Sequence, residues 1–265
     1  MPLQFHPAQV RQTKLRLALF GPSGSGKTCS ALRMAAGIAG ERGRVAVIDT
    51  EFGRAAKYGR EFTFDHANLE DPKLPAYVDA LHVAAERHYD VTIIDSLSHG
   101  WQELLEQVDR SAMGKFRGNK WAAWSEGTPM QKALVNAIVQ HPGHLIATMR
   151  SATAWEVQAD ENGRKVPVRL GLKPEQRAGI EYEFDLLLEL NTDHVATVIK
   201  DGTGVAALQD EAIQFPDENL GRRLKAWLED DTLPPAELPV GRPITRSATT
   251  TTDTTDGDAP PDVDI

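Results

Sequence analysis

Short apolar runs recur along the chain and predict buried β-strands. They cover residues 14–20, 44–50, 89–95 and 144–150. The first run alternates leucine with other residues, and the next three are short and mostly apolar. Such strands are typical of a sheet that helices cover on both faces.

Segments with helical spacing separate these runs. Residues 28–40, 74–88 and 128–141 each carry apolar side chains at intervals of three or four positions. An alternation of strands and helices favours a doubly wound, mainly parallel α/β sheet.

The later part of the chain has a different pattern of elements. Residues 166–172, 184–190 and 194–200 read as strands with only short connections, and residues 191–193 (NTD) read as a hairpin turn. We therefore expect antiparallel strands on the C-terminal side of the sheet, followed by a helix over residues 217–230.

The composition fits one large domain. The chain has 265 residues, 41% of them hydrophobic, and a mean hydropathy of −0.37, which suffices for one core but not for a second full domain.

No stretch approaches the roughly 18–20 apolar residues that cross a bilayer, and the first residues lack the layout of a signal peptide. These features predict a cytoplasmic protein without membrane contact. The single cysteine, Cys29, excludes an internal disulfide.

Charge is distributed unevenly. The net charge of −9 indicates that the surface as a whole repels nucleic acid, so any DNA contact requires a local basic patch. Residues 231–265 are rich in Thr, Asp and Pro and cannot bury enough apolar surface to offset their ordering entropy. They predict a disordered acidic tail after a domain at residues 1–230. The tail either regulates binding or recruits a single-strand-binding or replication partner, or it is an inert extension.

A phosphate-binding motif follows the first predicted strand and opens the first predicted helix. Residues 21–28 read GPSGSGKT and satisfy G-x-x-x-x-G-K-[ST]. The glycines let backbone N–H groups face a phosphate. Lys27 is expected to reach the β- and γ-phosphates, and Thr28 to bind Mg²⁺. The predicted ATP-binding residues are Gly21, Pro22, Ser23, Gly24, Ser25, Gly26, Lys27, Thr28 and Cys29.

Two aspartates end predicted strands and compete as the second magnesium contact. We choose Asp95 over Asp49 because Asp95 ends the more apolar strand and precedes the small polar Ser96. A simple helix cap is its alternative role. Glu51 lies two residues beyond Asp49, at the crevice where such sheets bind ligands. It is the candidate general base for the water that attacks the γ-phosphate, with a solvated loop glutamate as the alternative.

Four segments in order, GPSGSGKT, VIDTEFGRA, VTIIDSLS and LIATMR, resemble the RecA-type recombinase ATPase core. Over residues 14–205 the chain looks most like phage-encoded RecA-like ATPases that act as single-strand annealing proteins. The resemblance implies a RecA-like P-loop NTPase fold, ATP and Mg²⁺ as ligands, water activation by Glu51 and a magnesium site completed by Asp95. It also implies a homo-oligomer with ATP at the subunit interface and, for a phage protein, location in the host cytoplasm.

The resemblance also bears on the neighbouring subunit and on γ-phosphate sensing. Residues 196–204 resemble the segment of RecA-like and ring-helicase cores in which a basic residue reaches the next subunit's ATP, which assigns Lys200 a catalytic role. An ordinary exposed lysine is the alternative, and Gly202 stands where ring helicases usually have an arginine. An Asn-Gln pair usually ends the fourth strand, so Thr148 or Arg150 is the candidate sensor here.

Two basic segments are candidate sites for single-stranded DNA. Residues 110–125 combine basic side chains with aromatic rings and contain no carboxylate, a combination that tracks phosphates and stacks bases. Core packing of the tryptophans is the alternative. Residues 163–177 are also basic, and the resemblance places a DNA-binding loop there, with a solvated hairpin as the alternative. The candidate DNA-binding residues are Lys115, Phe116, Arg117, Lys120, Trp121, Arg164, Lys165 and Arg169.

These features together predict an ATP-binding and hydrolysing protein that binds single-stranded DNA and promotes annealing or recombination. A ring motor or another DNA-processing ATPase with the same core is the first alternative. A small-molecule kinase shares the phosphate motif, and a module that binds ATP without hydrolysis also stays open. Glu51 and the basic segment at residues 110–125 favour an ATPase that acts on DNA over the kinase.

Overall fold

The computed structural model describes residues 13–159, 165–203 and 212–229. These residues belong to one compact unit. The predicted tail at residues 231–265 lies outside the described residues, so its disorder and the domain boundary stay predictions. In the described part of the chain, no helix is long and apolar enough to cross a membrane.

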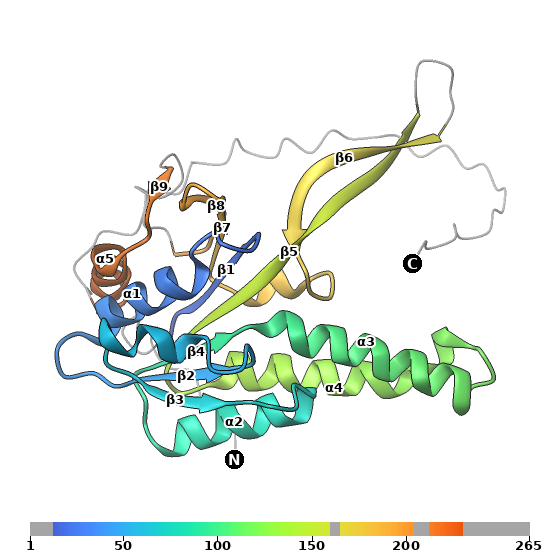
Figure 1. Cartoon of the computed structure of the whole chain (residues 1–265), viewed down its shortest axis with the longest axis horizontal. Helices are drawn as coiled ribbons and strands as arrows, with labels where there is room; N and C mark the ends of the chain where they lie inside the picture. The colour runs from blue at the N-terminus through green and yellow to red at the C-terminus, as the bar shows by residue number, and fades with distance from the viewer. Residues whose placement is uncertain (1–12, 160–164, 204–211, 230–265) are drawn as a thin grey trace, which may run out of the picture. The chain divides into compact units, whose positions relative to one another are not determined.

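Nine strands of the described residues form one sheet (Figure 1). Their order is β3-β2-β4-β5-β1-β7-β8-β9, and β6 pairs with β5. Neighbours from β3 to β7 are parallel, whereas β6, β8 and β9 pair antiparallel. The predicted doubly wound, mainly parallel sheet with antiparallel strands on its C-terminal side is therefore confirmed. The strands are β1 Arg16–Gly21, β2 Val45–Asp49, β3 Asp65–Asn68, β4 Val91–Asp95, β5 His144–Ala159, β6 Lys165–Pro174, β7 Leu186–Leu190, β8 Val195–Asp201 and β9 Ile213–Gln214.

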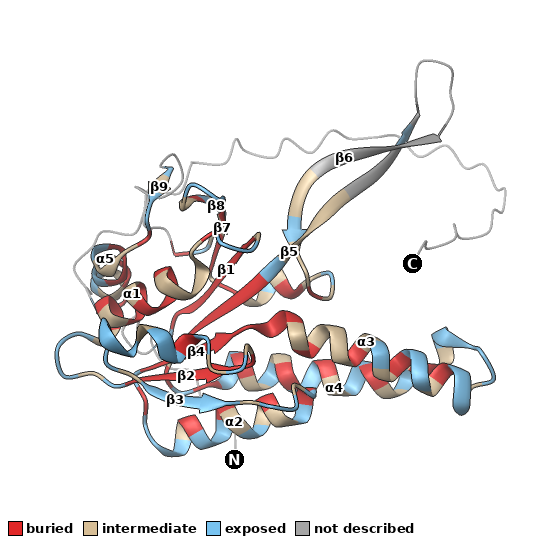
Figure 2. Cartoon of the chain, in the orientation of Figure 1, coloured by how far each residue is buried: buried red, intermediate tan, exposed pale blue. Residues whose placement is uncertain are grey.

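Helices cover the sheet on both faces because the central strands are apolar on both sides. Every residue of β1 is buried. Leu17 and Leu19 pack against α1 and α5, whereas Ala18 and Phe20 join the cluster formed by α2, α3 and α4. Figure 2 shows β1, β2 and β4 as buried strands among helices that expose their outer sides. The helices are α1 Lys27–Ala39, α2 Leu74–Glu86, α3 Leu97–Gly114, α4 Lys120–Gln140 and α5 Glu218–Glu229, with 3-10 helices η2 Ala55–Arg60 and η3 Ile180–Glu183.

The structure contains more helix between residues 97 and 140 than the sequence predicted. The predicted helix at residues 128–141 is only the second half of α4, and α3 was not predicted. The apolar side chains of Leu97, Trp101, Leu104 and Val108 nevertheless have helical spacing. The basic segment at residues 110–125 therefore spans the end of α3, a short connection and the start of α4.

Strand β5 is also longer than predicted. Up to Arg150 it pairs with β1 in the parallel sheet. From Ser151 onward it pairs antiparallel with β6, and the two strands form a ribbon that projects from the sheet (Figure 1). Arg150 thus marks the point at which the chain leaves the core.

A buried polar cluster lies where β1 and β5 begin. The Arg16 guanidinium donates hydrogen bonds to the backbone carbonyls of His141 and Gly143, which satisfies acceptors at the end of α4. The ring of His144 accepts a hydrogen bond from the Leu15 N–H at 3.1 Å. Burial, assisted by nearby cations that include Arg16, lowers the pKa of both His141 and His144 to about 4.

These histidines predict an acid-sensitive fold. Because their ordinary pKa is about 6.5 and their folded pKa about 4, the unfolded chain binds more protons within this window, and stability decreases as the pH falls through it. We expect the melting temperature to drop over that range. The drop should be smaller in His144→Asn, whose amide oxygen can still accept the Leu15 N–H. The same pH dependence in both proteins would contradict the assignment.

Candidate functional site

The phosphate motif forms a tight loop between β1 and α1. Gly24 and Gly26 adopt φ values of 81° and 84°, in the left-handed region that favours glycine. Gly21 is also constrained, since a Cβ there would lie 2.2 Å from the carbonyl oxygen of Leu190. The loop therefore requires its glycines, and the N-terminus of α1 opens toward it as an anion site would.

Lys27 lies over this loop. Its ammonium donates hydrogen bonds to the carbonyl oxygens of Gly21 at 2.9 Å and Pro22 at 2.8 Å. Burial lowers the pKa of Lys27, and the carboxylates of Asp95 and Glu51 oppose that shift. The side chain is thus placed at the phosphate loop and within the field of both predicted carboxylates.

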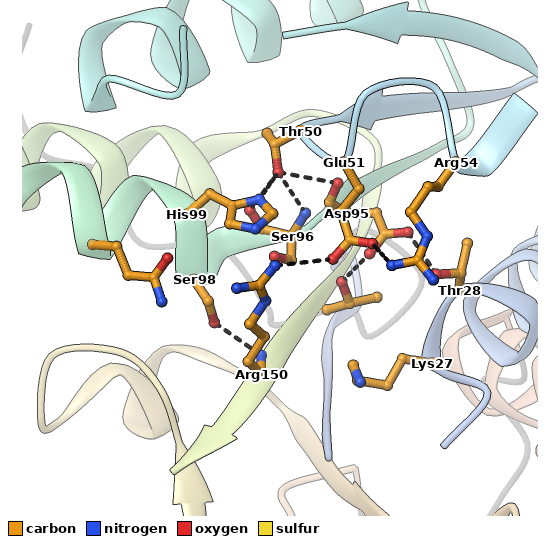
Figure 3. A network of polar contacts seen from close by, with 12 residues as sticks. Lys27, Thr28, Thr50, Glu51, Arg54, Asp95, Ser96, Ser98, His99 and Arg150 are labelled. Carbon is orange, nitrogen blue, oxygen red and sulfur yellow. Dashed lines mark hydrogen bonds and ion pairs between the residues drawn. The ribbon is translucent and has the colours of Figure 1, made fainter. Parts of the chain in front are cut away.

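Asp95 connects three elements of the site. One carboxylate oxygen accepts a hydrogen bond from the Thr28 hydroxyl of α1 at 2.7 Å, and the other accepts one from Thr148 of β5. Burial raises the pKa of Asp95, and the two hydroxyl donors counteract this effect. Figure 3 shows the carboxylate at the centre of this network.

The donor set at Asp95 and Thr28 fits Mg²⁺. A hydroxyl and a carboxylate are hard oxygen ligands, which this ion prefers when it is also bound by phosphates and water. Within the described residues, no group of three or more His, Cys, Asp or Glu side chains could hold a metal ion. A magnesium ion bound here would therefore have few protein ligands and depend on the nucleotide.

Asp49 has a structural role. Its carboxylate is fully buried and accepts hydrogen bonds from the backbone N–H groups of Glu51 and Ala55, and it pairs with His66 at 3.1 Å. These bonds fix the turn after β2. Asp49 therefore sets the position of Glu51 and has little capacity left for a metal.

Glu51 lies at the C-terminal edge of the sheet beside two arginines. Its carboxylate oxygens lie 2.8 Å from Arg54 Nη1 and 3.6 Å from Arg150 Nη2. Figure 3 shows the side chains of both arginines directed toward this part of the site. The side chain is 18% exposed, so it is not a solvated loop glutamate. Arg54 belongs to the turn after β2, and its part in this cluster was not predicted from the sequence.

Further hydrogen bonds, made by the hydroxyls of Thr50 and Ser98, hold the backbone around the site. The Thr50 hydroxyl lies 2.8 Å from His99 Nδ1 and also contacts the backbone of Ser96. The Ser98 hydroxyl accepts a hydrogen bond from the Arg150 N–H and donates one to the Glu175 carbonyl. The first turn of α3 is thereby connected to β2 and to the base of the β5–β6 ribbon.

One cavity of about 770 Å³ joins these groups. It contains the phosphate loop, Lys27, Thr28, Glu51 and Asp95, so the structure brings the predicted ATP-site residues together. The rings of His194 and Phe215 also line it, with centroids 5.4 Å apart. No sequence motif indicates this pair, because its two members come from separate turns. Five cationic side chains face three carboxylates in the lining: Lys27, Arg33, Arg54, Lys57 and Arg150 against Glu51, Asp95 and Glu175.

The predicted DNA-binding residues of the first segment lie away from this cavity. Lys120 pairs with Asp109 at 2.7 Å, and Lys115 pairs with Glu126. The helices thus supply carboxylates that the segment itself lacks. Phe116 is partly buried against the core, whereas Trp121 is 74% exposed.

The other predicted residues are also outside the cavity. Lys200 lies on β8 and donates hydrogen bonds to the backbone carbonyls of Glu181 and Tyr182. Lys165 and Arg169 lie on β6 of the ribbon, and Arg164 lies outside the described residues. A role of Lys200 in a neighbouring subunit and DNA binding by the ribbon stay predictions.

The two strand-ending aspartates give a matched prediction. Asp95→Asn should weaken Mg²⁺-dependent nucleotide binding while leaving Mg²⁺-free binding nearly unchanged, because the amide is a poor ligand for the ion. Asp49→Asn should instead lower the melting temperature, because an amide cannot accept all three of the bonds made by Asp49, and each unsatisfied buried donor costs about 1–3 kcal/mol. Calorimetric titration and thermal unfolding of both variants separate the roles, and an exchange of the two phenotypes would reverse the assignment.

Comparison with known proteins identifies the family. None of the curated proteins compared matches the chain. A solved structure, that of a KaiC-like protein from the hyperthermophilic archaeon Pyrococcus horikoshii, is similar at 13% identity with a TM-score of 0.38, over 70% of this chain and 78% of that one. That similarity is too low to carry residues or functions from one chain to the other. The family model of an AAA domain matches residues 13–214, which include the phosphate loop, Glu51 and Asp95. The chain therefore belongs to the AAA domain family of ATPases.

Proposed function

We propose that this protein hydrolyses ATP with Glu51 as the general base and that it couples hydrolysis to single-stranded DNA. The observation that carries the ATPase proposal is the common cavity of Lys27, Thr28, Asp95 and Glu51. A phosphate loop alone would only bind nucleotide, whereas a carboxylate beyond the metal ligand supplies a group that can accept a proton from water.

The principal residues of the cavity have defined parts in this proposal. The loop N–H groups and Lys27 bind the β- and γ-phosphates. Thr28 and Asp95 hold Mg²⁺, which when bound neutralises phosphate charge, and Thr148 orients Asp95 through its hydrogen bond. Glu51 accepts the proton of the attacking water. The rings of His194 and Phe215 lie at the same cavity and provide a surface on which a base can stack.

The DNA part of the proposal rests on the resemblance and on the basic segments. Exposed Trp121 near Lys115, Arg117 and Lys120 offers stacking and charge, although DNA must displace two ion pairs there. The same resemblance supports a homo-oligomer that promotes annealing, with Lys200 acting across a subunit boundary. A ring motor is the second candidate, and the Lys200 segment favours it.

Replacing the proposed base separates hydrolysis from binding. Glu51→Gln should retain ATP binding but lose about 10²- to 10⁴-fold in turnover, because the amide cannot accept the proton. Lys27→Ala should instead lose nucleotide binding. Phosphate release and ATP affinity measured on both variants test this, and a loss below about threefold in Glu51→Gln would remove Glu51 from the mechanism. Transfer of phosphate to a metabolite rather than to water would favour a kinase.

The DNA proposal predicts a change in salt dependence. Replacing Lys115, Arg117 and Lys120 with Ala should make the negative slope of log DNA affinity against log salt concentration shallower, by up to about 0.7 for each lost phosphate contact. Arg110→Ala is the matched control, because its guanidinium is held by two carboxylates, Glu103 and Glu106, whereas Lys115 and Lys120 each pair with one. An unchanged slope in the triple variant, with DNA binding intact, would move the DNA site to residues 163–177.

A further inference from the structure

Two arginines hold the proposed general base from opposite sides. Arg54 comes from the turn after β2, and Arg150 from the end of the parallel part of β5. Each contacts a different carboxylate oxygen of Glu51. Charge-assisted pairs of this kind stabilise the ionised carboxylate and orient it, but the two guanidinium groups also lie against both oxygens through which it would receive a proton.

The turn that carries Arg54 reverses the chain and so brings Arg54 next to Glu51. Phe52 and Gly53 have φ values of 57° and 80°, and these two successive left-handed residues reverse the chain. The buried carboxylate of Asp49 then fixes both ends of the turn through the N–H groups of Glu51 and Ala55. The backbone is therefore held, while the Arg54 side chain is 65% exposed and free to reorient.

Two of the other cations that line the cavity, Lys27 and Arg33, make more hydrogen bonds than Arg54 does. Lys27 donates to two loop carbonyls. Arg33 forms a two-pronged pair with Glu218 that joins α1 to α5. Arg54 and Arg150 share a single carboxylate, so an arriving phosphate that carries more charge than Glu51 competes well for them.

We infer that Arg54 is a γ-phosphate ligand of this ATPase and that it shields Glu51 until ATP arrives. The inference rests on the proposed nucleotide function and deepens it. In the absence of a γ-phosphate, Arg54 and Arg150 pair with Glu51. The γ-phosphate draws the Arg54 guanidinium away, and one oxygen of Glu51 becomes available to water. ADP lacks this group and leaves the pairs closed, so Arg54 distinguishes ATP from ADP.

Binding of a non-hydrolysable ATP analogue and of ADP, measured by calorimetry with Mg²⁺, tests the inference without relying on activity. Arg54→Gln should weaken analogue binding by about fivefold or more, the effect of losing a partly screened charge-assisted hydrogen bond, and change ADP binding by less than about twofold. Arg60→Gln is the matched control, because Arg60 is an exposed residue of η2 that does not line the cavity. It should change neither affinity.

A double-mutant cycle tests the competition with Glu51. Glu51→Gln should tighten analogue binding relative to ADP, because Arg54 no longer has to leave a carboxylate. That gain should shrink when Arg54→Gln is also present. An analogue-to-ADP affinity ratio that Arg54→Gln leaves unchanged, or a full gain in the double variant, would overturn the inference while the ATPase proposal stands. If the native protein bound neither nucleotide, the proposed function itself would fail.

Discussion

The site depends on the pair of hydrogen bonds that the buried carboxylate of Asp95 accepts. Asp95 ends β4, and its two oxygens receive the hydroxyls of Thr28 on α1 and Thr148 on β5. A buried carboxylate is costly unless hydrogen bonds satisfy it, so the ends of three elements are required to meet at this point. Because β5 lies between β1 and β4 in the sheet, the same bonds place Arg150, two residues beyond Thr148, at the cavity. The position of the phosphate loop relative to Arg150 therefore follows from one buried, hydrogen-bonded carboxylate.

Much of the architecture was predictable because strand signals are local. The runs that end at Asp49 and Asp95 are bounded by polar residues, and the glycine motif fixes where α1 begins. Helix α3 was not predicted although Leu97, Trp101, Leu104 and Val108 have helical spacing, because Leu97 is followed by the weak helix formers Ser98, His99 and Gly100. The site was only partly predictable. Lys27, Thr28, Asp95 and Glu51 stand in recognisable motifs, whereas the proximity of Arg54 to Arg150 and of His194 to Phe215 depends on tertiary contacts that no single segment reveals.

Electrostatics explains why distribution matters more than net charge in this chain. The whole protein has a net charge of −9, yet five cationic side chains face three carboxylates around the phosphate loop. This local excess attracts a polyanion, while the acidic remainder limits non-specific association. The helical hairpin of α3 and α4 shows the opposite arrangement. Its basic segment contains no carboxylate in sequence, but Asp109 and Glu126 neutralise Lys120 and Lys115 in space, so charge counted along the sequence overstates the basic character of this surface.

The bonds of Ser98 connect the cavity to the projecting ribbon. Its hydroxyl joins the Arg150 N–H to the Glu175 carbonyl, and these residues flank the first pair of the ribbon, Ser151 with Pro174. Both ribbon strands are thus fixed at their base to the first turn of α3, which begins two residues after Asp95. A side-chain movement of Arg150 can occur without disturbing these bonds, because they use its backbone. The guanidinium can therefore change partners within the cavity while β5 and the ribbon keep their register, which separates a mobile charge from a fixed scaffold.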